Sequence, residues 1–267
     1  MQLHPEWLVP DWPAPSNVGA VFTTRHGGVS LPPYDSLNLG RPSDDDAQAV
    51  STNRARLHAA LGMQPIYLSQ VHGTRSVQLD SMLAAGSVEA DACTSGVAGI
   101  VCAMRVADCL PVLLTDTGGR AVAAVHAGWR GLANGVLEVN FRQFEALLTG
   151  DRQSAASAPV AQQSLAWLGP CIGPTVFEVG PEVRSAFLKD DAQAAVCFSP
   201  LPGGKWLGDL AALARRRLRA LGIAQVYGND SSVRWCTVRN PSRFFSHRRD
   251  SVVLGGSGRM AACIWRL

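Results

Sequence analysis

The sequence predicts an α+β protein in which strands occur in groups with helices between them, rather than in regular βαβ alternation. Runs of apolar and β-branched residues at positions 66–71, 76–79, 99–114 and 121–125 are typical of short or buried strands. Helical periodicity occurs elsewhere, and no internal repeat is visible. A chain of 267 residues can bury a sizeable core, and we expect one domain that spans residues 1–267.

The composition is that of an ordinary globular protein. Hydrophobic residues make up 47% of the chain and charged residues 17%, which argues against the disordered and membrane-spanning classes. The net charge of +3, from 24 basic and 21 acidic residues, is too balanced to indicate a nucleic-acid partner. We therefore expect a small-molecule partner and neither nucleic acid nor membrane. The composition does not decide between a monomer and a homodimer.

Cysteine usage and the N-terminal sequence indicate a cytoplasmic protein. The seven cysteines are an odd number and contain no Cys-x-x-Cys pair, which favours free thiols in a reducing compartment over a disulfide framework. Residues 1–15 have neither the basic segment nor the apolar segment of a secretory leader. We therefore expect no export.

A long segment near the N-terminus is a candidate active-site rim. Residues 18–25 are predicted to form a strand and residues 47–61 a helix. Between them, residues 26–46 are rich in Gly, Pro, Ser and Asn. A connection of this length without structure of its own is usually functional or disordered. Because it follows Arg25 directly and contains Asn38, we interpret it as functional.

Later segments continue the mixture of strands and helices. Helices are expected at residues 131–148, 181–188 and 207–221, and strands at residues 165–168 and 260–265. Residues 149–163, rich in Ala, Ser and Gln, are interpreted as a surface loop. The four arginines of the 207–221 helix are interpreted as its solvated face rather than as a phosphate-binding patch.

Three side chains suited to catalysis stand where strand-like runs meet small or polar residues: His72, Cys109 and His126. The turn signal Thr117-Gly118-Gly119 separates Cys109 from His126 and predicts an antiparallel hairpin. A two-residue loop at Thr117-Gly118 would place Cys109 directly opposite His126, whereas a loop shifted by one residue would place them on opposite faces. Pro111 requires an edge or bulge position in this hairpin.

Two imidazoles and a thiolate are a suitable donor set for Zn²⁺, and three protein ligands leave a fourth position open, as in catalytic zinc sites. Copper is a second candidate because Cu²⁺ binds nitrogen and sulfur ligands more tightly than Zn²⁺. The alternative is that Cys109 belongs to the core and that each histidine is a hydrogen-bonded structural residue. The three residues are separated by 37 and 17 positions along the chain, and these separations favour neither the metal site nor the structural alternative.

Two further segments are candidates for anion binding. Gly128-Trp129-Arg130-Gly131 opens a predicted helix, where backbone N–H groups and Arg130 would favour a phosphate or carboxylate. The alternative there is a tight strand-to-helix turn. Residues 243–249, which include Arg248, form a second polar cluster, with a solvated loop as the alternative.

At these residues the chain resembles the laccase-domain, or YfiH-type, family, whose members are described as multicopper polyphenol oxidases and as purine nucleoside phosphorylases. The resemblance covers nearly the whole chain, and a series of motifs in order is more specific than any one of them. The departures are small: Cys171 and Ser251 stand where other small residues are common. The motifs are Thr24-Arg25-His26-Gly27-Gly28-Val29-Ser30, Ser36-Leu37-Asn38-Leu39-Gly40 and residues 69–74, 107–111, 126–131, 168–170, 177–180 and 244–250.

The resemblance implies a layered α/β/β/α sandwich with mixed sheets, a fold similar also to the catalytic domain of cytotoxic necrotizing factor. It implies a zinc ion held by His72, Cys109 and His126. It further implies phosphorolysis of adenosine, inosine, guanosine and S-methyl-5'-thioadenosine, together with adenosine deamination, so that the expected ligands are a nucleoside and phosphate. A peptidoglycan-editing role is attributed to some bacterial members.

Other activities stay open at this point. A multicopper oxidase needs several centres rich in imidazole, and the chain has six histidines in all, which makes a separate copper cluster hard to assemble. A single copper could still occupy the His72, Cys109 and His126 set. A metal-free hydrolase would use Cys109 as nucleophile and His126 as base. A binding module without catalysis is less consistent with an open metal site.

We assign roles to the remaining candidates on chemical grounds. Arg25 and Arg130 are expected to bind phosphate or another anion through their planar guanidinium groups, with Arg248 as a further substrate-binding residue. Asn38 is expected to hydrogen-bond the sugar or the base. Asp108 is a candidate proton shuttle for deamination, although its place beside Cys109 on a strand would point it away.

Overall fold

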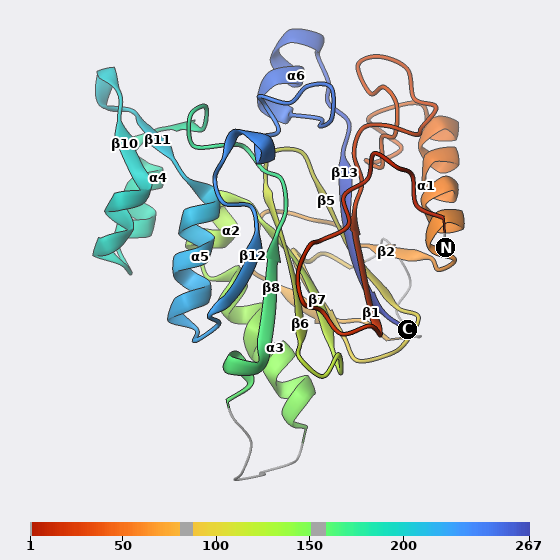
Figure 1. Ribbon diagram of the computed structural model, residues 1–267. Helices are drawn as coiled ribbons and strands as arrows, with labels where there is room; N and C mark the ends of the chain where they lie inside the picture. Colours follow the sequence, from red (N-terminus) through yellow and green to blue (C-terminus); the bar gives the residue numbers. More distant parts are fainter. Residues whose placement is uncertain (1, 81–87, 151–158) are drawn as a thin grey trace.

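The computed structural model describes residues 2–80, 88–150 and 159–267. Two sheets pack face to face, and helices cover the outer face of each sheet (Figure 1). The expected α+β class and the α/β/β/α layering are therefore confirmed. No described helix combines the length and the apolar character that a bilayer crossing requires.

The larger sheet has six strands in the order β12-β8-β6-β7-β4-β3. The two outer pairs, β12 with β8 and β3 with β4, are parallel, and the inner neighbours are antiparallel. All residues of β6 and β7 are buried because the sheet is covered on both faces. The strands are β3 (Ser76–Gln78), β4 (Ala92–Ser95), β6 (Leu110–Asp116), β7 (Val122–Ala127), β8 (Ser164–Leu168) and β12 (Gln225–Gly228).

The second sheet has four strands in the order β1-β13-β5-β2, of which β2 and β5 are parallel. A small third sheet has the order β10-β11-β9. The strands of the four-stranded sheet are β1 (Val18–Phe22), β2 (Pro65–Tyr67), β5 (Val101–Val106) and β13 (Met260–Arg266). Those of the small sheet are β9 (Glu178–Val179), β10 (Phe198–Pro200) and β11 (Trp206–Gly208).

The helices divide between the two outer faces. Helix α1 (Ala47–Leu61) packs Leu57 and Leu61 against the four-stranded sheet. On the other side, the six-stranded sheet shares a core with α2 (Trp129–Ala133), α3 (Val136–Thr149), α4 (Pro181–Leu188) and α5 (Leu210–Ala220). Helix α6 (His247–Leu254) lies at one end of the sheets, where the blue C-terminal segment approaches the orange N-terminal loops (Figure 1).

The core between the sheets explains the long apolar runs. Met104 and Ile264 of the four-stranded sheet pack in the same cluster as Leu113 and Trp167 of the six-stranded sheet, and all four are buried. Alternate residues such as Ala103 face the α1 side instead. Since both faces of each sheet are covered, apolar residues occupy consecutive positions, and simple alternation is lost.

The predicted helices at residues 47–61 and 181–188 are confirmed as α1 and α4. The Asp46 carboxylate caps α1 by accepting a hydrogen bond from the backbone N–H of Ala49 at 2.7 Å. The first residue of α4 is Pro181, whose fixed φ suits the first helical position. Both helices begin with a strong local signal, which is why their bounds are readable from the sequence.

Two other predicted helices differ in their bounds. The helix predicted at residues 131–148 is two helices, because Gly135 has a φ of 93° and separates α2 from α3. The helix predicted at residues 207–221 begins at Leu210. The Asp209 carboxylate caps it there by accepting a hydrogen bond from the backbone N–H of Ala212, while residues 206–208 pair as β11.

The predicted β6–β7 hairpin forms, but its predicted register is wrong. Pro111 lies opposite His126, and the pairing ends with Leu110 opposite Ala127, so the register differs from the predicted one by two residues. Cys109 comes directly before β6 and approaches His126 from the connection rather than from a paired strand position.

A single carboxylate accounts for the wider turn of this hairpin. Asp116 accepts hydrogen bonds from the backbone N–H groups of Gly118, Arg120 and Ala121 at 2.7–3.2 Å. Pro111 lies near the start of β6, opposite Gly169. Because proline has no N–H to donate to the Gly169 carbonyl, this carbonyl accepts a hydrogen bond from the Asn229 side chain.

Further segments depart from expectation. The strand expected at residues 18–25 ends at Phe22, and the run at 99–114 is two strands, β5 and β6. Residues from His247 form α6 rather than a solvated loop, and strands β4, β9, β10, β11 and β12 were not expected. Of the surface loop expected at residues 149–163, residues 151–158 lie outside the described residues, and Val160–Gln163 form a short 3-10 helix.

Candidate metal centre and its pocket

The three predicted ligands come together where the chain crosses between the two sheets. His72 follows β2, Cys109 lies in the short connection between β5 and β6, and His126 lies on β7. Cys109 Sγ is 3.7 Å from His72 Nε2, and the centroids of the two imidazole rings are 4.8 Å apart. One donor atom from each of the three residues lies within 4.8 Å of the other two.

Two glycines allow this close approach. A Cβ atom on Gly128 would lie 2.9 Å from the His72 ring and 3.1 Å from Cys109 Sγ. A Cβ atom on Gly131 would lie 2.6 Å from the carbonyl oxygen of Gly73. The Gly-Trp-Arg-Gly segment is therefore a tight strand-to-helix turn packed against the His72 loop, which was the alternative interpretation of this motif.

Asp91 holds two of the ligands at once. Its Oδ1 lies 2.7 Å from His126 Nδ1 and also accepts a hydrogen bond from the backbone N–H of His72 at 2.9 Å. Its Oδ2 accepts hydrogen bonds from the backbone N–H groups of Val71 and Gly73. With Nδ1 directed at Asp91, His126 presents Nε2 to the centre, as metal-binding histidines with a carboxylate partner do.

The backbone is strained on both sides of the centre. His72 has a φ of 62° and Asp108 a φ of 83°, in the left-handed region that favours glycine. The Asp108 carboxylate is directed toward α6, where it accepts hydrogen bonds from the hydroxyls of Thr237 and Ser246 and from the backbone N–H of Arg248. These donors occupy both oxygens, which gives Asp108 a structural place beside Cys109.

The charges of the site favour the thiolate form of Cys109. Burial raises the pKa of the Cys109 thiol, but the charge of His126 and hydrogen bonds from both imidazoles outweigh burial and lower this pKa to about 6. For His126, burial lowers the imidazole pKa, while Cys109 and Asp91 raise it to about 9. At neutral pH Cys109 is therefore a thiolate, the form that binds metal ions.

The donor set fits a single zinc or copper ion. Zinc bonds of about 2.3 Å to sulfur and about 2.0 Å to nitrogen at a tetrahedral angle separate the two donor atoms by roughly 3.5 Å. The observed separation between Cys109 Sγ and His72 Nε2 is 3.7 Å. Two nitrogen donors and one thiolate suit both metals, and the geometry does not select between them.

The centre opens into a pocket of about 490 Å³, a volume within the range of small-molecule sites. Trp129, Ile172, Phe177 and Leu210 form an apolar wall, which belongs to the core on the helix side of the six-stranded sheet. Three arginines from the four-stranded sheet and the 26–46 loop also line it: Arg41 of the loop, Arg105 of β5 and Arg259 directly before β13. The pocket therefore offers an apolar surface, a metal centre and a basic surface in one space.

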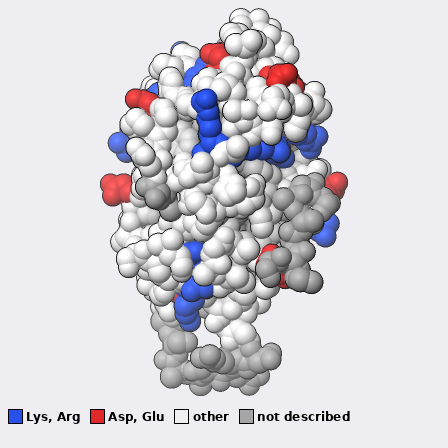
Figure 2. All heavy atoms as spheres, turned by 90° about the vertical axis from the view of Figure 1, so that its right-hand side faces the viewer, with Lys and Arg blue, Asp and Glu red and all other residues white. Residues whose placement is uncertain are grey.

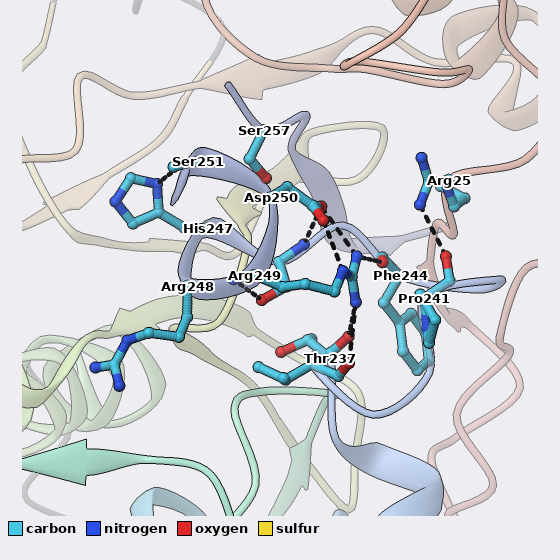
Figure 3. Close-up of polar contacts among 12 residues, drawn as sticks. Arg25, Thr237, Pro241, Phe244, His247, Arg248, Arg249, Asp250, Ser251 and Ser257 are labelled. Atoms are coloured by element: carbon cyan, nitrogen blue, oxygen red, sulfur yellow. Dashed lines mark hydrogen bonds and ion pairs between the residues drawn. The ribbon is translucent and has the colours of Figure 1, made fainter. Parts of the chain in front are cut away.

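Of the predicted substrate-binding residues, Arg25 and Asn38 lie outside the lining of this pocket. Arg25 donates hydrogen bonds to the carbonyl oxygens of Asp35 and Pro241, the latter visible in Figure 3, and pairs with the Asp35 carboxylate. Asn38 is buried, and its Oδ1 accepts hydrogen bonds from the backbone N–H groups of Gly40 and Arg259. Both side chains are engaged with the protein itself.

The other two predicted residues differ from each other. Arg130 is exposed and lies over the Trp129 ring at 4.5 Å, outside the pocket lining. Arg248 lines the pocket and donates hydrogen bonds to the carbonyl oxygen of Glu178. At the start of α6, His247 and Arg248 extend to one side, and Arg249 extends to the other, toward Thr237 and Phe244 (Figure 3).

Several pocket and support residues were not predicted. Asp91 and the arginines Arg105 and Arg259 lie in or next to apolar strands, where a charged residue is itself a signal because burying an unpaired charge is costly. His247 belongs to the predicted polar cluster at residues 243–249, but its place at the start of α6, which the Ser246 hydroxyl caps by accepting a hydrogen bond from the backbone N–H of Arg249, was not predicted.

The comparisons with known proteins agree on the family. The model of a family described as multi-copper polyphenol oxidoreductase laccase matches residues 19–267. Purine nucleoside phosphorylase YfiH of Shigella flexneri is 47% identical over 97% of this chain and 98% of its own. A purine nucleoside phosphorylase of Pseudomonas aeruginosa is 45% identical over the same shares. The chain belongs to this laccase family.

A solved structure supports the same membership. The crystal structure of a Neisseria meningitidis protein matches this fold with a TM-score of 0.86 and 42% identity, over 98% of this chain and 99% of that one. The laccase family is enzymatic and metal-binding, and the His-Cys-His group is where a metal can bind in this chain. Within residues 2–80, 88–150 and 159–267, no second cluster of three or more His, Cys, Asp and Glu side chains is close enough to share an ion.

Proposed function

We propose that the protein is a zinc-dependent purine nucleoside phosphorylase that cleaves adenosine, inosine, guanosine and S-methyl-5'-thioadenosine with inorganic phosphate. The observation that carries the proposal is the pocket, which the His72, Cys109 and His126 group lines together with an apolar wall and three arginines. A purine nucleoside needs the apolar wall for its base, and phosphate needs the arginines. Relatives that match almost the whole chain carry the phosphorylase name.

The apolar wall suits a planar base. Trp129 and Phe177 supply aromatic faces, and Ile172 and Leu210 complete an apolar surface. Arg130 lies over the Trp129 ring, and Arg248 lies 6.0 Å from the Phe177 ring centroid, so each aromatic side chain is supported by a cation. These contacts would hold the purine while the bond to the sugar breaks.

His247 is placed to assist the departing base. It lines the pocket, and its Nδ1 lies 2.8 Å from the Ser251 hydroxyl, which leaves Nε2 available in the pocket. Burial and the charge of Arg259 lower the pKa of His247 below its usual value. A neutral imidazole at pH 7 can donate or accept one hydrogen bond at a purine nitrogen.

Zinc bound by His72, Cys109 and His126 would supply a Lewis acid at the floor of the pocket. The chain's own part is to hold the three donors in place. Asp91 fixes the His126 ring and the His72 backbone, and the turn at Gly128 leaves room for both His72 and Cys109. We propose that adenosine deamination occurs in the same pocket and competes with phosphorolysis.

The test compares nucleosides with and without phosphate. Adenosine with phosphate is expected to yield adenine and ribose 1-phosphate, and adenosine in phosphate-free buffer only slow formation of inosine, both measured by chromatography. Both products are expected to disappear in His126→Ala, because both reactions use one site. Turnover that persists in His126→Ala would contradict the shared site, and no turnover by the zinc-loaded protein would contradict the proposal.

A metal-free hydrolase is the second candidate, because the Cys109 thiolate lies beside two imidazoles. The two proposals differ in metal dependence. A hydrolase of this kind would keep its activity after chelation and lose it on alkylation of Cys109, whereas the phosphorylase is expected to lose activity on chelation and regain it with zinc. A copper oxidase would need copper in place of zinc, which elemental analysis of the purified protein decides.

A further inference from the structure

Three arginine side chains line the basic end of the pocket without an acidic partner. Arg41, Arg105 and Arg259 all line it, and none of them forms an ion pair with any residue in the described part of the chain. The acidic side chain in the lining at this end is Asp44, which is exposed and accepts a hydrogen bond from Ser43. Asp45 lies beside this lining, where its carboxylate accepts a hydrogen bond from Asn38, so three guanidinium groups against two carboxylates leave this end positively charged.

Arg105 is held in position by neutral contacts. Its guanidinium donates a hydrogen bond to the carbonyl oxygen of Leu68 at 2.8 Å and lies over the Tyr67 ring at 5.6 Å. Both its backbone N–H and its backbone carbonyl are hydrogen-bonded to the side chain of Gln70. These contacts fix the stem of Arg105 and leave further N–H donors of its guanidinium for a ligand.

Arg259 and the loop that carries Arg41 are joined through a buried side chain. Asn38 Oδ1 accepts hydrogen bonds from the backbone N–H groups of Arg259 and Gly40, both at 2.9 Å. Arg259 also donates hydrogen bonds to the carbonyl oxygens of Ser257 and Gly258. Arg105 and Arg259 are therefore positioned before any ligand arrives, which reduces the entropy cost of binding, whereas the exposed Arg41 is placed through the backbone of its loop.

The crowding of like charges has a cost that an anion would remove. Burial, followed by the charges of Arg54, Arg41 and Arg259, lowers the pKa of Arg105 to about 10. The three arginines give this end of the pocket a positive field, although Asp and Glu side chains lie among the Lys and Arg side chains on the upper half of the face that carries α1 (Figure 2). Such a field draws anions toward the site.

We propose that Arg41, Arg105 and Arg259 form the subsite that binds inorganic phosphate. The proposal rests on the phosphorolysis proposed above, for which phosphate is the second substrate. Planar guanidinium groups match phosphate oxygens in a bidentate manner, and three of them offset the charge of a phosphate dianion. The subsite lines the same pocket as the metal centre and the apolar wall, so phosphate and a base held by Trp129 and Phe177 would occupy one space.

The test measures phosphate binding directly, by calorimetry at low ionic strength, on the purified protein with its bound metal. Arg41→Met and Arg105→Met keep an unbranched side chain and remove one charge each. Each variant is expected to weaken phosphate binding at least about tenfold, because it loses charge-assisted hydrogen bonds to phosphate. The zinc content is expected to stay unchanged. The control is Arg219→Met, which removes the same charge from an exposed position on α5 and is expected to bind phosphate as the wild type does.

Phosphate binding that is unchanged in both pocket variants, or weakened equally in Arg219→Met, would overturn the proposal. A second arm uses adenosine 5'-monophosphate, whose phosphate group has the same chemistry. If the variants weaken binding of the nucleotide but not of free phosphate, the subsite belongs to a phosphate ester and the proposal is wrong. If the wild type releases no base yet binds phosphate through these arginines, the subsite stands and the phosphorylase function falls.

Discussion

At the scale of single residues, Asp91 is the side chain on which the geometry of the centre depends most. It is fully buried, and it hydrogen-bonds the His126 ring and three consecutive backbone N–H groups of the His72 loop. The hydrogen bonds from this loop and from His126 lower the pKa of Asp91 against the opposing effect of burial. The Asp91 carboxylate therefore sets the orientation of the His126 ring and holds the strained backbone at His72.

We predict that Asp91→Asn weakens zinc binding about 10- to 100-fold, the usual effect of removing a partner of a metal-binding histidine. The measurement is competition against a chelator of known affinity. Asp116→Asn is the matched control, because Asp116 is also buried and also accepts three backbone hydrogen bonds, but at the far end of β6. Equal zinc affinities in the two variants would show that Asp91 acts on stability alone.

The sequence identifies the ligands but not their supports, for a physical reason. His72, Cys109 and His126 each stand at the end of a strand-like run, which is a local signal. Asp91 lies directly before β4, a strand that was not predicted, and Asn38 acts through a backbone N–H more than 200 residues away. Such contacts follow from the packing of distant segments, and no spacing along the chain reports them.

At the scale of elements, the turn between β6 and β7 shows how one side chain sets a register. Asp116 accepts backbone hydrogen bonds from Gly118, Arg120 and Ala121 and pairs with the Arg120 side chain at 2.8 Å. These bonds close a turn that is wider than two residues, and the register follows from it. The sequence signal Gly118-Gly119 predicted the turn but not its width.

We predict that Asp116→Asn lowers the free energy of unfolding at pH 7 by about 1–3 kcal/mol, the cost of losing hydrogen bonds to a buried charge. Burial opposes ionisation of Asp116, but the Arg120 side chain and the turn amides lower its pKa. Because the pKa of Asp116 is lower in the folded protein than in the unfolded chain, its ionised carboxylate stabilises the fold at pH values above the unfolded pKa of about 3.9. This contribution is lost as the pH falls through the folded pKa. Denaturant unfolding at pH 7 and at successively lower pH is therefore expected to show the difference from wild type shrinking below about pH 4. A difference that stays constant would contradict this assignment.

Helices that begin with a local sequence signal were predictable, whereas short strands that form only by hydrogen-bonding to distant strands were not. The cap at Asp46 and the proline of α4 mark helices whose bounds agree with prediction. Strands β9, β10 and β11 have two or three residues each and are stabilised by their neighbours in the small sheet. Helix α6 was not predicted: Asp250 accepts a hydrogen bond from the backbone N–H of the Ser246 cap, but it stands four residues after the cap rather than the three of a capping box.

At the scale of the whole molecule, the centre lies where the two sheets are joined. His72 follows a strand of the four-stranded sheet, His126 is on a strand of the six-stranded sheet, and Cys109 lies in the connection between them. The α/β/β/α layering, expected from the family resemblance, explains this place, because the chain passes from one sheet to the other at residues 107–109. A metal bound there would connect the sheets at a point where the backbone is strained at His72 and Asp108.

We predict that metal removal lowers the thermal stability of the whole protein. An ion that binds only the folded state, at a free concentration about 100 times its Kd, raises the free energy of unfolding by about 2.7 kcal/mol. For a chain of this size this corresponds to a rise of several degrees in Tm. Chelation followed by dialysis is expected to lower the Tm measured by calorimetry, and added zinc to restore it. Cys109→Ala is expected to show little response to either treatment, whereas Cys197→Ala, a buried thiol away from the centre, is expected to respond as the wild type does. A wild-type Tm that is the same with and without zinc would mean that zinc does not bind the folded protein in preference to the unfolded chain, which would contradict the proposed metal site.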